Sequence, residues 1–317
     1  MSKTSLNAII GEHLTLLPTN LEGVHTIQAP PADFDPLTAS SATLMRLGFP
    51  PRPDAAKNPY EAKIWTEILS RKLTHVAPQL AVRPEKKGFH GATKGAAGLT
   101  SSNWSGGIIF NGAPFTCVSG SWTVPAVVPP PGSGNGDWWS VAWVGIDGYN
   151  SRDVLQAGTG HHVKRSGGTV TTEYFAWFEW YPFNWTQITN FAVHPGDTVT
   201  VLVRYFGLVN GAGQASATVT NNTTGQSTTV TLTPPAGVTL AGNCVEWIME
   251  RPTINGSLAG LPEYNHISFY GTIAASARSL FNGSQAQPVL MTNSAGVTLS
   301  AASLGATDWD CTFAASA

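Results

Sequence analysis

The chain has 317 residues, of which 42% are hydrophobic, so it can build a sizeable core in one large domain or two ordinary ones. Only 11% of the residues are charged, less than half of the usual ~25%, and the net charge is −2. This balance gives no indication of a nucleic-acid partner, and no apolar run approaches the ~18 residues that a membrane span needs. Few carboxylates also suit a protein that must stay folded in acid.

The charges are unevenly placed along the chain. Residues 1–100 carry eleven Lys and Arg side chains against eight Asp and Glu, a net charge of +3. Because the whole chain is −2, the remainder is −5. A basic first third therefore precedes an acidic remainder.

The first third predicts one helix. The first 40 residues are polar and rich in proline, which predicts an extended or poorly ordered segment without an apolar signal core. A helix is expected near 59–75, because Asn58 is a good N-cap, Pro59 suits the first helical position and Glu61 completes a capping-box pattern. Residues 84–100 are basic, Gly/Ala-rich and without periodicity, which indicates a linker or an exposed segment open to cleavage.

The character of the chain changes at Ser101. Ten of the eleven tryptophans lie beyond this point, in short strand-like runs separated by turn-rich pieces such as VVPPPGSGNGD. We find no convincing helix there. The pattern predicts an all-β domain over 101–317, an antiparallel sandwich or barrel, behind a partly helical N-terminal region over 1–100.

Residues 173–182 (EYFAWFEWYP) alternate as a strand does. One face carries small or apolar residues that suit a core: Tyr174, Ala176, Phe178 and Trp180. The other face carries aromatic residues and one carboxylate: Phe175, Trp177, Glu179 and Tyr181. Flat aromatic area with an orienting polar group is what a binding floor needs. The alternative is that these aromatics fill a second layer of the sandwich and that Glu179 is paired or solvated.

A second strand pattern, NCVEWIME over 243–250, contains two carboxylates. Glu246, Ile248 and Glu250 share one face, and Val245, Trp247 and Met249 share the other. An unpaired buried carboxylate is costly, so two Glu residues on so apolar a strand need an explanation. The alternative is that both lie at a solvated edge.

Metal and nucleophile motifs are missing from the sequence. His161 and His162 are adjacent, so on a strand they face opposite ways and cannot share a metal. Cys117, Cys244 and Cys311 have no metal-ligand spacing, and we expect neither a metal nor a cofactor. One disulfide is possible, but the sequence does not choose the pairing, and Cys244 is best interpreted as a buried thiol.

Seven short motifs occur together in the second part of the chain: SNWSGG at 102–107, VSGSWTVP at 118–125, AWVGIDG at 142–148, VLQAG at 154–158, AWFEWYP at 176–182, GD at 196–197 and VEWIME at 245–250. In order and spacing, over about residues 101–275, the sequence resembles the glutamic peptidase (eqolisin) family of acid endopeptidases. The resemblance implies a two-sheet antiparallel β-sandwich of concanavalin-like or jelly-roll type. It also implies an active site made by a Gln and a Glu on a concave sheet.

The family's catalytic residues match Gln156 and Glu246 of this sequence. Other residues at matching motif positions are implied to line the substrate cleft: Trp104, Trp143, Asp147, Glu179 and Tyr181. At Phe175 the sequence departs from the family, where one well-known member has an acidic residue.

The chemistry of such a pair is reasonable, since peptide hydrolysis needs a base for water and donors for the oxyanion. We expect Glu246 to take a proton from water, while Gln156, whose amide always donates and always accepts, orients that water and stabilises the oxyanion. Donors around Glu246 are expected to keep it ionised in acid, which gives a low-pH optimum. A pair of this kind predicts a pepstatin-insensitive enzyme.

Family resemblance also implies protein and peptide substrates, secretion to the extracellular space and a propeptide, a role that fits the basic first third. The expected protein is a monomer without membrane or nucleic-acid partners. Two alternatives stay open at this point. One is a carbohydrate-binding, lectin-like β-sandwich without catalysis, since a tryptophan-lined sheet also suits sugar rings. The other is a catalytically inactive relative.

Overall fold

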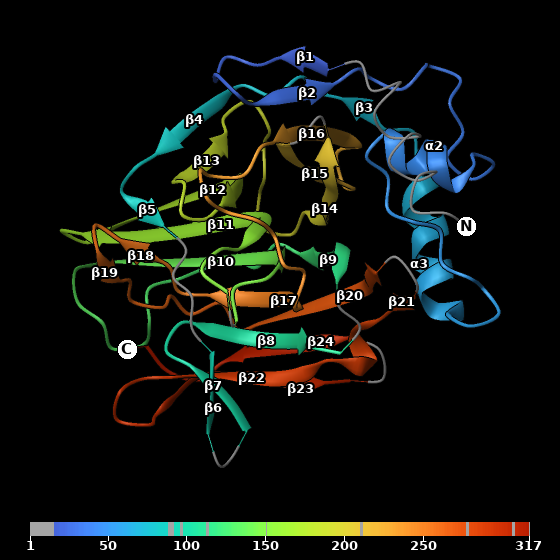
Figure 1. The fold of residues 1–317 in the computed structure, drawn as a ribbon. Coiled ribbons are helices and arrows are strands. Elements are labelled where there is room, and N and C mark those ends of the chain that lie inside the picture. The colour runs from blue at the N-terminus through green and yellow to red at the C-terminus, as the bar shows by residue number, and fades with distance from the viewer. Residues whose placement is uncertain are drawn as a thin grey trace.

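The computed structural model describes residues 16–87, 92–95, 98–111, 114–149, 151–209, 212–276, 279–305 and 308–316. These residues form a mostly β structure, as predicted (Figure 1). Helices are confined to short pieces: α2 (Ser41–Arg46), α3 (Pro59–Leu69) and the 3-10 turn η1 (Gly283–Gln285). Among the described residues, no helix is long and apolar enough to cross a membrane.

One arm of the sheet holds most of the strands that carry the sequence motifs, and neighbours in it are antiparallel. Its strand order is β4 (Leu80–Arg83), β13 (Trp185–Ile188), β12 (Thr169–Trp180), β11 (Leu155–Ser166), β10 (Gly136–Ile146), β17 (Val245–Glu250), β8 (Trp104–Ile109) and β22 (Gln287–Thr292). We call this run the front arm. Beyond β22 lie β7 (Gly98–Ser101), β6 (Ala92–Gly95), β23 (Thr298–Leu304) and β24 (Trp309–Phe313).

A second run, the back arm, packs behind the first. Its strands are β20 (His266–Ser276), β21 (Leu280–Phe281), β9 (Phe115–Thr123), β14 (Thr198–Val209), β15 (Ala212–Asn221), β16 (Gln226–Leu232), β3 (Thr74–His75), β2 (His25–Ile27) and β1 (Leu16–Pro18). A separate three-stranded sheet joins β5 (Lys86–Lys87), β18 (Thr253–Ile254) and β19 (Ser257–Leu258).

The two arms are joined to each other through β20. The first four residues of β20 pair with β24, and the rest of the strand pairs with β9, so one 21-stranded sheet is continuous through β20. Gly271 lies at this change of partner with a φ of 57°, a left-handed conformation that glycine adopts without strain. The strand can therefore bend and carry the sheet from one arm to the other.

The main hydrophobic core lies between the arms. Ala176 and Phe178 of β12 and Trp247 of β17 contact it, together with Val201 and Val203 of β14. The opposite faces of β12 and β17 belong to a second cluster that includes Trp177 and Ile248. The alternation predicted for both strands is therefore confirmed.

Helix α3 packs on the outside of the back arm, in a small cluster of its own that includes Leu44, Trp65 and Ile273. The helix ends at Leu69, earlier than the expected 75, because the chain then leaves to pair β3 with β16. Asn58 makes no side-chain cap, and Glu61 is buried at 3% exposure instead of closing a capping box.

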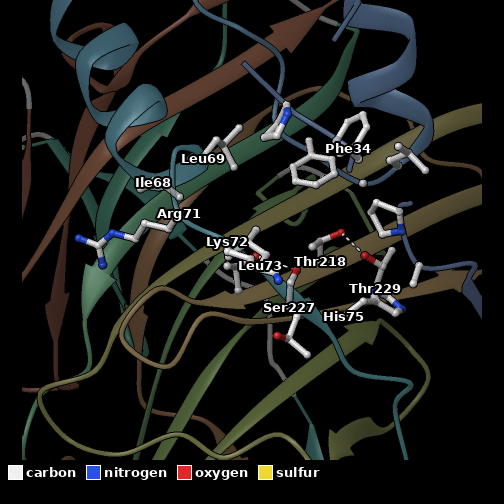
Figure 2. Close-up of a pocket in the computed structure, with 18 of the residues that line it drawn as sticks. Phe34, Ile68, Leu69, Arg71, Lys72, Leu73, His75, Thr218, Ser227 and Thr229 are labelled. Atoms are coloured by element: carbon white, nitrogen blue, oxygen red, sulfur yellow. Dashed lines mark hydrogen bonds between the residues drawn. The ribbon is translucent and has the colours of Figure 1, made fainter. Parts of the chain in front are cut away.

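A cavity of about 310 Å³ separates this N-terminal region from the outer face of β14–β16 (Figure 2). Its wall on the side of the sheet is polar and includes Thr218, Ser227 and Thr229, and Thr218 and Thr229 bond each other through their hydroxyls at 2.9 Å. The opposite wall includes Phe34 and Leu73. The N-terminal region therefore rests on a hydroxyl-rich surface and leaves part of it uncovered.

All three cysteines, Cys117, Cys244 and Cys311, are buried free thiols. The disulfide that the sequence left open is not formed, and the interpretation of Cys244 as a buried thiol is confirmed.

Candidate active site

One row of residues crosses four strands of the front arm. Glu246 of β17 is the partner of Gly145 of β10, which on its other side is the partner of Gln156 of β11, and Gln156 is in turn the partner of Glu179 of β12. Partners in neighbouring strands present their side chains on the same face. With strands ~4.8 Å apart, the Cα atoms of Glu246 and Gln156 are roughly 9–10 Å apart. The strand register thus brings together the two residues that the sequence singled out.

Gly145 leaves room for the ring of Trp143 beside these two side chains. A Cβ atom at this position would lie 2.6 Å from Cζ3 of Trp143 and 3.3 Å from Cβ of Gln156. The first distance is shorter than non-bonded carbon atoms tolerate. Glycine is therefore required here by packing.

Glu246 is completely buried. Its Oε1 accepts a hydrogen bond from Sγ of Cys244 at 2.8 Å, and its Oε2 has no partner among the described residues. Burial raises the pKa of Glu246 well above its ordinary value, the Cys244 hydrogen bond opposes this, and the nearby charge of Asp147 raises the pKa further. The expectation that surrounding donors hold Glu246 ionised in acid is wrong for this structure, because the described residues give it only a single weak donor.

Gln156 is also buried, at 1% exposure. Its Nε2 donates to Oε2 of Glu179 at 2.6 Å, while its Oε1 has no partner among the described residues. A carboxylate can only accept hydrogen bonds, so the atom of the Gln156 amide that contacts Glu179 is identified as the nitrogen. The second N–H and the carbonyl oxygen of Gln156 are left for other partners.

Glu250, four residues after Glu246 on the same face, is held differently. Its carboxylate accepts from Nε1 of Trp143 at 2.7 Å and from Nδ2 of Asn103 at 3.1 Å, and it is fully buried. Hydrogen bonds to an ionised acceptor are strong enough to offset much of the desolvation cost. The alternative of two solvated glutamates is therefore wrong, because both carboxylates lie inside the molecule.

Asp147 supports the segment that leads into β17. Its carboxylate accepts the backbone N–H groups of Ala241 and Gly242, both at 2.8 Å, and of Asn243 at 2.6 Å. Its own backbone N–H donates to the carbonyl of Cys244 at 3.1 Å. Burial raises the pKa of Asp147, and these backbone donors lower it. Asp147 thus fixes the chain just before Glu246.

An aromatic floor surrounds the row on the same face. Trp104 meets Trp143 edge-on with ring centroids 5.1 Å apart, and Trp177 stacks on Trp185 at 4.3 Å. All four belong to the second hydrophobic cluster, and Tyr181 packs half-buried against it. Four of the five residues that the resemblance implied for the cleft, Trp104, Trp143, Glu179 and Tyr181, therefore lie on or beside this floor.

Residues 80–87, which we call the strap, run along one end of this face. Strand β4 of the strap extends the sheet beside β13, and β5 then pairs with β18 (Figure 1). The backbone N–H of Asn255 donates to the carbonyl of Glu85 at 2.9 Å. The described part of the expected 84–100 linker is therefore largely β structure, and the rest of it lies outside the described residues.

The positively charged side chains of the strap lie beside Glu173 and Asp137, at the edge of the aromatic floor. Lys86 is 2% exposed, with Nζ 4.1 Å from the ring centroid of Trp139 and 4.4 Å from that of Phe175. Burial lowers the pKa of Lys86 to about 8, and the charge of Glu173 opposes this. Arg83 lies 3.7 Å from the carboxylate of Glu173. Arg83, Glu85 and Lys86 of the strap thus line a cavity of about 590 Å³ beside the floor.

The two adjacent histidines face opposite ways, as predicted. His161 lies in the interior beside Ser140 and Thr159, and burial lowers its pKa to about 3. His162 lies on the cleft face, stacked on Trp139 at 3.6 Å and bonded to Asp137 at 2.8 Å. Within the described part of the chain, no group of three or more His, Cys, Asp and Glu side chains is placed to hold a metal ion.

Comparison with known proteins decides the family. The sequence matches the Peptidase A4 family over residues 102–313. The chain belongs to this family. It is 32% identical over 202 residues to aspergillopepsin-2 of Aspergillus niger, which covers 59% of this chain and 68% of that protein. It is also 32% identical over 150 residues to scytalidopepsin B of Scytalidium lignicola, covering 47% of this chain and 51% of that protein.

A solved structure agrees with these relatives. The structure of scytalido-glutamic peptidase with a transition state analog inhibitor superposes with a TM-score of 0.56 at 25% identity, over 68% of this chain and 99% of that one. The resemblance to glutamic peptidases is therefore confirmed, and this member of the Peptidase A4 family is a peptide hydrolase. The carbohydrate-binding alternative loses its support.

Two contributors to the site were missed at the level of sequence. Gly145 stands in the AWVGIDG motif, but its role depends on strand register. Cys244 was interpreted as a plain buried thiol, although its spacing of two residues from Glu246 already placed both side chains on one face.

Proposed function

We propose that this protein is an acid endopeptidase that cleaves proteins and peptides with Gln156 and Glu246 as its catalytic pair. The row across the front arm carries this proposal. Both side chains flank Gly145, and each keeps one buried oxygen atom without a partner among the described residues. Buried polar atoms are costly unless something binds them. A peptide carbonyl and the water that attacks it supply suitable partners.

In the proposed reaction, the carboxylate of Glu246 removes a proton from water, and the resulting hydroxide attacks the peptide carbonyl carbon. The negative charge that develops on the carbonyl oxygen is stabilised by the N–H of Gln156 that Glu179 does not use. Glu246, now protonated, gives its proton to the leaving nitrogen as the C–N bond breaks. Because no pair of carboxylates shares a proton here, we expect the enzyme to resist pepstatin.

The present structure is a closed form of this enzyme. Glu246 and Gln156 are 0% and 1% exposed, so a peptide cannot reach them. Burial also raises the pKa of Glu246, which disfavours the ionised form that acts as the base. We infer that opening the cleft to water and substrate lowers this pKa and switches the pair on.

We propose that residues 1–100 are a propeptide and that residues 101–317 are the catalytic domain. The N-terminal region has a hydrophobic cluster of its own around Trp65. It rests on a hydroxyl-rich face of the back arm that tolerates exposure to water once uncovered. Its strap places Lys86 and Arg83 against the cleft. These features suit a segment that is made with the enzyme and later removed.

We further infer that the two arms correspond to the two layers of a concanavalin-like or jelly-roll sandwich, in which β20 joins the layers. The fit to 99% of the scytalido-glutamic peptidase chain supports this assignment. Secretion and a monomeric state complete the proposal. The low share of charged residues, 11%, supports an extracellular, acid-tolerant protein.

The direct test is cleavage of a denatured protein at pH 3 and pH 7 in the presence of pepstatin, after acid incubation of the full chain. The variant Glu246→Gln keeps the shape of the side chain and removes the base, and Glu263→Gln, whose residue lies outside the row, is the matched control. We expect pepstatin-resistant cleavage at pH 3 that falls about 10²–10⁴-fold in Glu246→Gln and stays near wild type in the control. Substantial activity in a folded Glu246→Gln protein would remove Glu246 from its role.

A further inference from the structure

We propose that Cys244 is a positioning residue for the catalytic carboxylate. Its thiol holds Oε1 of Glu246, so that Oε2 is the oxygen atom that takes the proton from water. This inference rests on the proposed role of Glu246 and adds a second residue to the same site.

The geometry of the pair is direct. Sγ of Cys244 lies 2.8 Å from Oε1 of Glu246, and the two residues are 1% and 0% exposed. They stand two positions apart where the chain enters β17, so their side chains project to the same side. Within the described part of the chain, the thiol is the one hydrogen-bond donor to this carboxylate, and Oε2 has no partner.

The backbone that carries the thiol is itself held in place by Asp147. Asp147 donates its backbone N–H to the carbonyl of Cys244 at 3.1 Å. Its carboxylate also binds the backbone N–H groups of the three preceding residues, 241–243. Asp147 therefore fixes the backbone of residues 241–244, and the side chain of Cys244 on this backbone binds Glu246. Such an arrangement fixes one carboxylate oxygen while the other stays free to react.

The direction of the hydrogen bond is fixed by protonation. Burial raises the pKa of Cys244 well above its ordinary value, and the neighbouring charge of Glu246 raises it further, so the thiol keeps its proton throughout the acid range. It therefore donates whenever Glu246 is ionised. A donor to the ionised form lowers the pKa of a carboxyl group, which opposes the effect of burial on Glu246.

Removal of the Cys244 thiol should therefore shift the pH dependence of peptidase activity. Without the thiol, the pKa of Glu246 is higher, and a higher pH is needed to generate the base. The acid limb of kcat/KM against pH should then move upward by about one unit, since hydrogen bonds to charged groups are worth about that much. At a pH on that limb, kcat should fall about tenfold, and KM should change little because Cys244 does not contact the substrate in this proposal.

Two pairs of variants, each matched in volume, test this in the acid-activated enzyme: Cys244→Ala with Cys244→Ser, and Cys244→Val with Cys244→Thr. Cys244→Ala and Cys244→Val remove the donor, and Cys244→Ser and Cys244→Thr supply a hydroxyl in its place. We expect the acid limb to shift in Ala and Val and to return toward wild type in Ser and Thr. The control is Cys311→Ala, which removes another buried thiol, one that bonds the carbonyl of Ser105 at 3.3 Å. It should lower thermal stability without moving the limb.

An unmoved acid limb in folded Cys244→Ala and Cys244→Val overturns the proposal. So does an equal shift in all four variants, because that would be an effect of packing and not of the donor. Failure of the proposed function looks different, since Glu246→Gln would then remain active whatever stands at 244. The two pairs also keep the test decisive if one of the smaller variants does not fold.

Discussion

At the scale of single residues, the proposed active site depends on the absence of a side chain at Gly145 as much as on the side chains around it. In the proposed mechanism Glu246 and Gln156 act on one substrate, and Gly145 stands between them in the row. Trp143 packs over the same glycine and also donates to Glu250 at 2.7 Å. The glycine therefore couples the position of the catalytic pair to that of the aromatic floor.

We predict that Gly145→Ala lowers kcat/KM of the activated enzyme at least tenfold, and up to about 100-fold. The new Cβ must displace Trp143 or Gln156, and a shift of about 1 Å in a catalytic group can cost that much. Peptidase kinetics at pH 3 give the readout, with folding checked by thermal unfolding. Gly134→Ala is the matched control, because a Cβ there meets nothing within 4 Å. Wild-type kinetics in a folded Gly145→Ala enzyme would contradict this account of the row.

Residue patterns in the sequence were sufficient to assign faces but not to assemble the site. The period of two in β12 and β17 correctly separated Glu179 from Phe178 and Glu246 from Trp247. The row itself depends on strand register between segments about 100 residues apart in sequence, which no local pattern encodes. Only the family resemblance paired Gln156 with Glu246 in advance.

At the scale of elements, the strap shows the same limit. Lys86 lies in a basic, Gly-rich stretch that has every local sign of a solvated linker. Its buried position exists because Trp139 of β10 and Phe175 of β12 form an aromatic pair around its Nζ. A cation held over aromatic rings and away from water is stabilised by up to about 2 kcal/mol. The surroundings that give the strap its structure thus come from distant strands.

We predict that Lys86→Glu releases the strap at neutral pH. The new carboxylate would be buried against the aromatic rings and close to Glu173 and Asp137, so attraction becomes repulsion. Hydrogen exchange of residues 80–87 at pH 7 should become faster by tenfold or more. Lys57→Glu, which makes the same charge change on a side chain that is 80% exposed, should leave the exchange unchanged. Unchanged exchange in Lys86→Glu would show that charge does not hold the strap.

At the scale of the whole molecule, the basic residues 1–100 precede an acidic remainder, and acid should weaken the attraction between these two parts, which we propose to be propeptide and catalytic domain. Arg83 and Lys86 lie beside Glu173, and carboxylates in general lose most of their charge near pH 3, whereas Lys and Arg side chains keep theirs. His162 adds to this effect. It lies between Asp137 at 2.8 Å and Glu173 at 3.8 Å, beside Lys86 of the strap.

The sign of the histidine contribution follows from its pKa, which burial lowers from 6.5 against the opposing pull of Asp137 and Glu173. A group whose pKa is lower in the folded state stabilises that state above its unfolded pKa, and this stability is lost as the pH falls through the folded pKa. The closed form is therefore stabilised near pH 7 and loses that contribution below about pH 6.5. Protonated His162 then repels Lys86 as well.

We accordingly predict that the N-terminal region separates from the catalytic domain as the pH falls from 7 to 3, and that His162→Gln moves the midpoint of separation to lower pH. Glutamine can still bond Asp137 but does not gain a charge, so only the carboxylates remain to trigger opening. Hydrogen exchange of the strap and the appearance of peptidase activity, both followed against pH, should shift together. His194→Gln, at a side chain that is 69% exposed, should shift neither. Should the His162→Gln midpoint equal that of wild type, opening depends on the carboxylates alone.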